Sequence, residues 1–227
     1  MQLMYQKKLY KFLMVLKMKN KIAIIANGSI NNSNFLTNYT DDADIVICAD
    51  GGANTARDYN IRPDYIIGDM DSIKSTVLHD FTDEGNTKII KDTNEEKTDL
   101  ELALSLAETL DPNEIVILGA IGDRIDHTLA NIMCLNYIKP EIKAKIIDEK
   151  NIIELVENSI EIEGDEDNIV SVVPLTDVFG LSYNGLKWLV NDKNTKFGWF
   201  GISNRLSKNK ANISLKKGKI LVIRANE

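Results

Sequence analysis

A chain of 227 residues can form one large domain or two smaller ones, and its 44% apolar and 27% charged residues are typical of a globular protein with a packed core. The net charge of -7 disfavours a nucleic-acid backbone as the main ligand, because like charges repel. No stretch of the sequence approaches the roughly 20 uncharged apolar residues of a membrane helix, which argues against a membrane-embedded protein. A metal-bound nucleotide or a cationic ligand suits this charge better.

Residues 1–20 are predicted to form a basic tail. They carry lysines but no acid, and Lys11 and Lys17 interrupt the apolar run that a secretory signal needs. The arginines and serines of a mitochondrial presequence are absent from this segment. The alternative hypothesis is a translation start placed too early, for which Met14 and Met18 are candidate starts.

Two cysteines, Cys48 and Cys134, lie inside apolar runs and outside any Cys-x-x-Cys pattern. This placement predicts buried free thiols, which suit the reducing cytoplasm.

From Lys21 to about Glu149, short apolar strands alternate with helical stretches, which predicts an α/β fold with a mostly parallel sheet flanked by helices. Most strands are continuous Ile/Val runs, as expected when both faces of a sheet are covered. The clearest helices are Thr98–Leu110, which opens with the Thr-x-x-Glu of a capping box, and Asp126–Ile138. The predicted strands are Lys21–Ala26, Asp44–Ala49, Asp64–Ile67, Lys88–Lys91, Glu114–Gly119 and Ala144–Asp148.

After about Asn151 the pattern changes to short strands separated by turn residues, which predicts a smaller C-terminal all-β sandwich or barrel. The segments Ala211–Leu215 and Lys219–Arg224 flank a Gly-containing turn and are predicted to pair as a hairpin. The expected organisation is therefore a tail over 1–20, an α/β domain over 21–150 and a β domain over 151–227.

Acidic residues gather where the predicted parallel strands end. Asp50 follows one strand, Asp69 and Asp71 follow the next, and Asp99 opens the helix after a third. Ligands of open α/β sheets bind at the carboxyl ends of the strands. Residues two apart in an extended segment point to the same side, so Asp69 and Asp71 are expected to reach one cation. Carboxylate oxygens, water and substrate phosphates are the ligands that Mg²⁺ prefers.

Each acidic motif also has a purely structural explanation. Asp-Gly-Gly at Asp50 is a common turn, Asp99 suits the first turn of a helix, and Asp126 suits a helix N-cap. Their occurrence together at successive strand ends favours a metal–nucleotide site. The sequence contains no P-loop motif, and Gly119–Gly122 does not complete a dinucleotide-binding motif.

Four ordered motifs resemble the thiamine pyrophosphokinase family over roughly residues 21–225. They are Ala49–Asn54, Gly68–Ser72, Thr98-Asp99, and Gly122–His127 followed by Leu129–Asn131. In the β half, Gly185–Trp188 and Ser203-Asn204 are similar to that family's vitamin-binding segment. The resemblance implies an α/β catalytic domain, a C-terminal β-sandwich, and a homodimer whose active site lies between the subunits.

The resemblance also implies roles for individual residues. The Mg²⁺ ligands would be Asp69, Asp71 and Asp99. The nucleotide would bind at Asn27, Gly51, Gly52, Asn54, Asp69 and His127. The catalytic residues would be Asp50, Asp71, Asp99, Arg124 and Asp126. Thiamine would be held by Asp126 and by Trp188, Ser203 and Asn204 of the other subunit.

The reaction expected from this resemblance transfers a diphosphate from ATP to the hydroxyl of thiamine and releases AMP. Either Asp126 or Asp99 could take the hydroxyl proton, and the sequence leaves this choice open. Two other hypotheses remain: a pyrophosphokinase or Mg²⁺-dependent phosphohydrolase acting on another small heterocycle, and a non-catalytic thiamine or nucleotide sensor.

Overall fold

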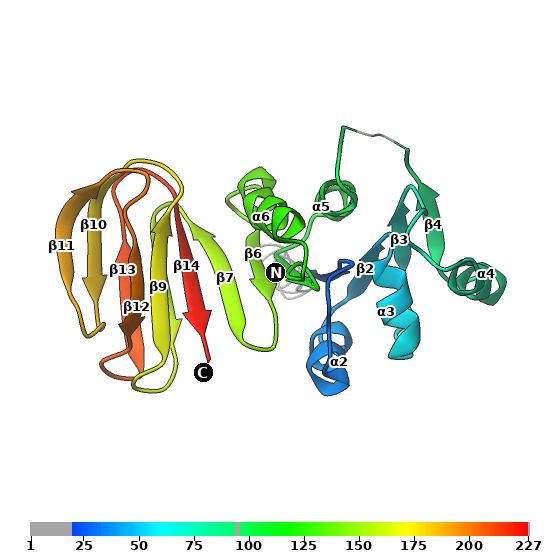
Figure 1. Cartoon of the computed structure of the whole chain (residues 1–227), viewed down its shortest axis with the longest axis horizontal. Helices are drawn as coiled ribbons and strands as arrows, with labels where there is room; N and C mark the ends of the chain where they lie inside the picture. Colours follow the sequence, from blue (N-terminus) through cyan, green and yellow to red (C-terminus); the bar gives the residue numbers. More distant parts are fainter. Residues whose placement is uncertain (1–19, 94–95, 227) are drawn as a thin grey trace, which may run out of the picture. The chain divides into compact units, whose positions relative to one another are not determined.

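The computed structural model describes residues 20–93 and 96–226, so the predicted basic tail lies outside it except for its last residue (Figure 1). The chain divides into two compact units. The first holds the chain up to Asn27, Ser33–Val116 and Lys139–Lys143; the second holds Gly28–Asn32, Ile117–Ile138 and Ala144–Glu227. The predicted boundary near residue 150 stays a prediction.

A parallel sheet forms the centre of the first unit, as predicted. Strands β1 (Lys21–Ile25), β2 (Ile45–Ala49), β3 (Tyr65–Gly68) and β4 (Lys88–Lys91) pair in parallel in this order. Strand β5 (Glu114–Leu118) comes next to β1 on its other side. All but the first residue of β1, β2 and β3 are buried, which is why these strands read as continuous apolar runs.

Helices cover both faces of this sheet. The crossovers from β1 to β4 run in one direction and carry α2 (Ser33–Asp41), α3 (Gly52–Asp58) and α4 (Ser75–Glu84), whereas α5 (Asp99–Thr109) leads back to β5. Right-handed crossovers therefore place α5 on the face opposite the other three, as Figure 1 shows. The predicted capping box is confirmed, because the Thr98 side chain accepts from the Glu101 N–H and the Glu101 carboxylate accepts from the Thr98 N–H.

The second unit contains one α-helix, α6 (Ile125–Met133), which continues into a short 3-10 turn, η1 (Cys134–Tyr137). The sequence predicted a single helix over Asp126–Ile138. In the structure the α-helix ends at Met133, and the last turn has the tighter 3-10 geometry. None of the residues of α6 is buried, although the helix is amphipathic. Its apolar side chains Ile125, Leu129 and Met133 are exposed.

Two facing sheets make up the rest of this unit, as the predicted sandwich requires. One is formed by the consecutive strands β12-β9-β14-β7-β6 of the larger, ten-stranded sheet, and the other is the four-stranded sheet β11-β10-β13-β8. Their buried residues form one apolar core. The strands are β6 (Lys143–Ile147), β7 (Asn151–Val156), β8 (Ser159–Glu163), β9 (Ile169–Pro174), β10 (Val178–Asn184), β11 (Val190–Thr195), β12 (Gly201–Arg205), β13 (Lys210–Ser214) and β14 (Ile220–Ala225).

The predicted C-terminal hairpin is wrong. Strand β13 pairs with β8 and β10, whereas β14 pairs with β7 and β9 in the opposite sheet. The turn between them, with Gly218 at φ 115°, crosses from one sheet to the other instead of folding back. Buried residues of both strands, such as Ile213 and Val222, meet in the common core, so crossing still buries the apolar side of each strand.

No helix within residues 20–93 and 96–226 has both the length and the apolar composition needed to cross a membrane.

Candidate metal and nucleotide site

Three carboxylates come together at the carboxyl ends of β2 and β3. Oxygens of Asp50, Asp69 and Asp71 all lie within 4.8 Å of one another. Neighbouring parallel strands end at the same sheet edge, so the two loops that carry these acids are adjacent. The described part of the chain provides no Lys or Arg ion pair to any of the three.

Asp50 is the buried member of this cluster, with only 1% of its surface exposed. The Ser72 N–H donates to its Oδ2 at 2.9 Å, whereas its Oδ1 is buried without a hydrogen-bond partner among the described residues. Burial raises the pKa of Asp50, hydrogen bonds from Ser72 lower it, and the carboxylates of Asp69 and Asp71 raise it again. A buried carboxylate oxygen without a partner is costly, and a bound cation would satisfy it.

Asp69 and Asp71 converge through a turn, not through the extended segment that the sequence suggested. Met70 between them has φ 69°, and the Asp71 N–H donates to Asp69 Oδ1 at 3.0 Å. The Ser72 hydroxyl donates to Asp71 Oδ1 at 2.8 Å. The expected proximity of the two carboxylates is thus present, but a left-handed residue and an Asx turn produce it.

Asp99, the third predicted metal ligand, approaches the same cluster from the first turn of α5. Burial and then the charges of Asp50, Asp69 and Asp71 raise the pKa of Asp99 to about 6, against the lowering effect of the Asp69 N–H that it accepts. Gly68 separates Asp99 from Asp50, because a Cβ there would lie 2.8 Å from Asp99 Oδ1 and 2.7 Å from Asp50 Cβ. Only glycine lets these two acids flank the end of β3.

The predicted nucleotide-binding residues of the first unit surround this cluster. A Cβ on Gly51 would lie 2.4 Å from the side chain of Asn27, so the two residues are in close contact. A Cβ on Gly52 would lie 2.1 Å from the Ile25 carbonyl oxygen, which explains why α3 starts with glycine. Asn54 donates to the Ser72 carbonyl at 2.9 Å and accepts from the Lys74 N–H at 2.9 Å, and so holds the acidic loop against α3.

Sequence reasoning missed Ser72 as part of the site. Its N–H donates to Asp50 and its hydroxyl donates to Asp71, while its carbonyl accepts from Asn54. The only available signal was its position directly after Asp71.

Three predicted residues of the second unit lie at the start of α6. Arg124 donates to Asp126 through Nε at 2.9 Å and through Nη2 at 2.6 Å, a bidentate pair that is exposed to solvent. This pairing lowers the pKa of Asp126 below its usual range. His127, the next residue, is also exposed. The two hydrogen bonds from Arg124 to the Asp126 carboxylate set the orientation of the planar guanidinium.

The predicted thiamine-binding residues lie in the β-sandwich of the second unit. Trp188 is 55% exposed, and Lys187 Nζ lies 5.3 Å from its ring centroid. Ser203 is exposed and has φ 59°, whereas Asn204 is buried. The Trp188 N–H donates to Asn204 Oδ1 at 3.1 Å, and Asn204 Nδ2 donates to the Trp188 carbonyl at 2.7 Å.

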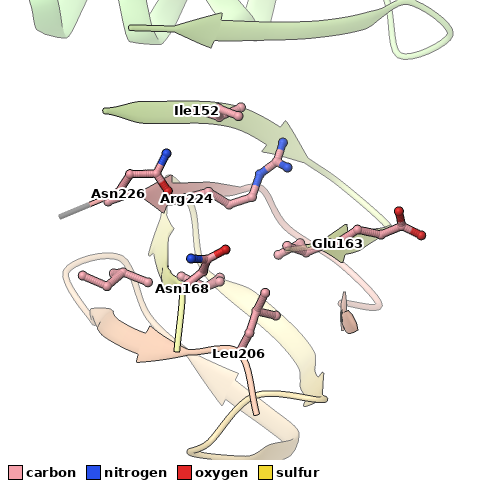
Figure 2. A pocket seen from close by; sticks show the side chains of 10 residues that line it. Ile152, Glu163, Asn168, Leu206, Arg224 and Asn226 are labelled. Atoms are coloured by element: carbon pink, nitrogen blue, oxygen red, sulfur yellow. The ribbon is translucent and has the colours of Figure 1, made fainter. Parts of the chain in front are cut away.

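A hollow of about 110 Å³ in the same sandwich is a separate feature (Figure 2). Its lining includes Ile152, Asn168, Leu206 and Arg224, and it includes none of the predicted site residues. Arg224 pairs with Glu154 at 2.6 Å, while its Nε is buried without a partner among the described residues. This hollow therefore does not belong to the acidic site.

Taken together, a parallel α/β sheet and carboxylates at the ends of its strands define a class of α/β protein with a candidate divalent-cation site at the ligand-binding edge of the sheet. The comparisons with known proteins narrow this class. The family model described as "Thiamin pyrophosphokinase, catalytic domain" matches residues 36–146. The model described as "Thiamin pyrophosphokinase, vitamin B1 binding domain" matches residues 157–220.

Individual relatives agree with these models. The thiamine pyrophosphokinase of Bacillus subtilis is 33% identical over 211 residues, which cover 91% of this chain and 99% of the relative. Thiamine pyrophosphokinase 2 of Oryza sativa is 30% identical over 183 residues, which cover 69% of this chain and 68% of the relative. A crystal structure of the Bacillus subtilis protein has a TM-score of 0.83, with 31% identity over 91% of this chain and 99% of that one. The chain belongs to the thiamin pyrophosphokinase family.

Proposed function

We propose that this protein transfers the diphosphate of ATP to the hydroxyl of thiamine, forming thiamine diphosphate and AMP. The observation that carries the proposal is the convergence of Asp50, Asp69 and Asp71 within 4.8 Å in a chain of this family. The thiamine hydroxyl oxygen forms a bond to the β-phosphorus, and the bond from that phosphorus to the oxygen bridging the α-phosphate breaks. The hydroxyl proton passes to a base, and AMP leaves with the bridging oxygen.

The acidic cluster suits Mg²⁺. Its donors are all carboxylate oxygens, the ligands that Mg²⁺ prefers, and the buried Oδ1 of Asp50 has no other partner in the described chain. Asp69, Asp71 and Asp99 would hold the ion, and Asp50 would lie beside it with its otherwise unpartnered Oδ1 available to the ion. When bound, Mg²⁺ neutralises charge on the triphosphate, which phosphoryl-type transfer requires.

The chain's own residues supply alignment around the nucleotide. Asn27, Gly51, Gly52, Asn54 and His127 would contact ATP. The close approach of Asn27 to Gly51 supports this assignment, because it brings a polar amide to the sheet edge beside the acids.

Arg124 is proposed to contact the transferred phosphates, and Asp126 to orient Arg124 and the thiamine hydroxyl. The bidentate pair between them supports this division of roles. A carboxylate whose pKa is lowered by a bound guanidinium accepts a proton poorly, so Asp126 is the weaker choice as general base.

Thiamine would bind where Trp188 offers an exposed aromatic face to its aminopyrimidine. We also propose a homodimer in which Trp188, Ser203 and Asn204 come from the other subunit. Large apolar side chains that are exposed in the single chain support this arrangement, since a subunit interface would bury them. They are Ile125, Leu129 and Met133 on α6 and Trp188, Leu189, Phe197, Phe200 and Ile202 around β11 and β12.

The two other hypotheses are not favoured. A sensor without activity would not need the four acids at the strand ends, and an enzyme for another heterocycle does not explain the match of 157–220 to a vitamin B1 binding domain. A cytoplasmic location remains our proposal, which the two free buried cysteines support.

The decisive test is to incubate the purified protein with thiamine, ATP and MgCl₂ and to separate the products by chromatography. Thiamine diphosphate and AMP are expected in equal amounts. Thiamine monophosphate with ADP would contradict diphosphate transfer, and the absence of any product would favour a sensor.

A further inference from the structure

The segment that carries Trp188 is held by a short antiparallel ladder against the end of β12 and the residues that follow it. The Ser207 N–H donates to the Gly185 carbonyl at 3.0 Å, and the Lys187 N–H donates to the Arg205 carbonyl at 2.9 Å. Leu186 and Leu206 are bridge partners between these bonds, and both are buried. These backbone hydrogen bonds fix the chain from Gly185 to Lys187. Trp188, the next residue, lies just beyond them.

At Trp188 the hydrogen bonds to the backbone come from a side chain, that of Asn204. Ser203 has φ 59°, and the pairing of β12 with β9 shifts register between Gly201 and Asn204, so the backbone of β12 is irregular next to Asn204. The carboxamide of Asn204 supplies both partners: Oδ1 accepts the Trp188 N–H at 3.1 Å, and Nδ2 donates to the Trp188 carbonyl at 2.7 Å. A carboxamide has the same donor and acceptor as a peptide group, so it can extend a ladder by one residue.

This arrangement leaves Asn204 little capacity for a ligand. Its Oδ1 also accepts the Arg205 N–H at 2.9 Å, so both acceptor sites of this oxygen are used. The residue is 6% exposed, whereas Trp188 is 55% exposed. The side chain presented to a ligand is therefore the indole.

We propose that Asn204 is a positioning residue, whose amide clamps the Trp188 backbone and thereby sets the orientation of the indole, and that it does not itself contact substrate. The identity of the ligand, the aminopyrimidine of thiamine, rests on the proposed function, but the clamp does not. This assigns Asn204 a different role from the direct thiamine contact implied by the family resemblance.

A double-mutant cycle separates the two roles, using KM for thiamine and KM for ATP of Asn204→Ser, Trp188→Ala and the double variant. Asn204→Ser is expected to raise KM for thiamine roughly three- to tenfold, about the net free energy of a single hydrogen bond, because the indole is still present but less well oriented, with KM for ATP unchanged. In the Trp188→Ala background the same substitution should change KM by less than about twofold, because a residue acting through Trp188 has nothing left to position. The same factor in both backgrounds would overturn the proposal. Asn212→Ala, an exposed asparagine of β13, is the matched control.

Fluorescence tests the clamp without any substrate. The chain has two tryptophans, so Trp199→Phe leaves Trp188 as the single emitter. Asn204→Ser in this background is expected to lower the fluorescence anisotropy of Trp188 and to increase its quenching by acrylamide. Unchanged anisotropy and quenching would refute the clamp even if thiamine KM rises. If the wild-type protein makes no thiamine diphosphate, the proposed function fails, while this measurement still decides the role of Asn204.

Discussion

The Ser72 N–H donates to Asp50 Oδ2 at 2.9 Å and so ties the loop bearing Asp69 and Asp71 to the end of the neighbouring strand. This single bond explains how acids from two loops meet, and it leaves Asp50 Oδ1 buried and without a partner among the described residues. The geometry is already suited to a cation, because the acids are held together despite their mutual repulsion.

Asp71→Asn is expected to lower kcat at least about 100-fold, because it removes a proposed metal-binding carboxylate. Loss of a residue that only supports a metal ligand typically costs about 10- to 100-fold, and loss of the ligand itself should cost more. The substitution keeps the side-chain shape, so the circular dichroism spectrum should stay that of the wild type and the melting temperature should not fall. Steady-state assays of thiamine diphosphate formation check this. Asp58→Asn, an exposed acid on α3, should leave kcat unchanged. Near-normal turnover in Asp71→Asn would refute the metal assignment.

Mg²⁺ should stabilise the protein in the absence of substrates, because it binds the folded acidic cluster and not the unfolded chain. Asp69→Asn should have a higher melting temperature than the wild type without metal, since one repulsive charge is gone. MgCl₂ should raise the melting temperature of this variant little further. A change of 1 kcal/mol corresponds to about 2–4 °C for a chain of this size. Differential scanning fluorimetry with and without MgCl₂ measures both effects, and an equal Mg²⁺ response in the two proteins would contradict the site.

At a thiamine concentration well below the raised KM of Trp188→Ala, the variants Asp71→Asn and Trp188→Ala should complement each other if the active site combines two subunits. Asp71→Asn subunits would supply Trp188, and Trp188→Ala subunits would supply Asp71. Co-refolded mixtures are expected to recover about a quarter of wild-type activity, because half of the dimers are mixed and each mixed dimer has one complete site. Each variant refolded by itself is the control. No recovery in a mixture shown by light scattering to contain dimers would place each site within one subunit.

Gly52→Ala should lower the free energy of unfolding by about 1–3 kcal/mol or more, as overpacking does when the neighbour is backbone. A Cβ at this position would lie 2.1 Å from the Ile25 carbonyl oxygen. Gly122→Ala is the matched control, since its nearest neighbour would be 3.4 Å away. Urea denaturation measures both, and equal losses of stability would show that the close packing of α3 on β1 is not the cause.

The cysteines should not react in the native protein. Cys48 and Cys134 are 0% and 3% exposed, and burial raises the pKa of the Cys48 thiol well above its usual range. Because the thiolate is the reactive form, a colorimetric thiol reagent at pH 8 should label neither cysteine until guanidinium is added, after which both should react. Rapid labelling of the native protein would contradict the burial of these residues.

Local patterns were sufficient to predict the strands of the parallel sheet, the Thr98 capping box and the acids at successive strand ends. These features depend on side-chain periodicity and on spacing along the chain, which a sequence states directly. The ordered motifs likewise predicted the family. The same patterns could not tell that β13 and β14 belong to different sheets, since a Gly-containing turn serves a hairpin and a crossing equally well.

The tertiary structure decided which groups share hydrogen bonds. Asn204 was expected to contact a ligand, and the sequence did not indicate that its amide forms hydrogen bonds with both backbone groups of Trp188 beside the left-handed Ser203. Asp69 and Asp71 meet because Met70 turns the chain, and the unpaired oxygen of Asp50 exists because Ser72 reaches only the other one. Hydrogen-bond partners distant in sequence are selected by packing, so the chemical state of a polar side chain becomes known only when its neighbours are in place.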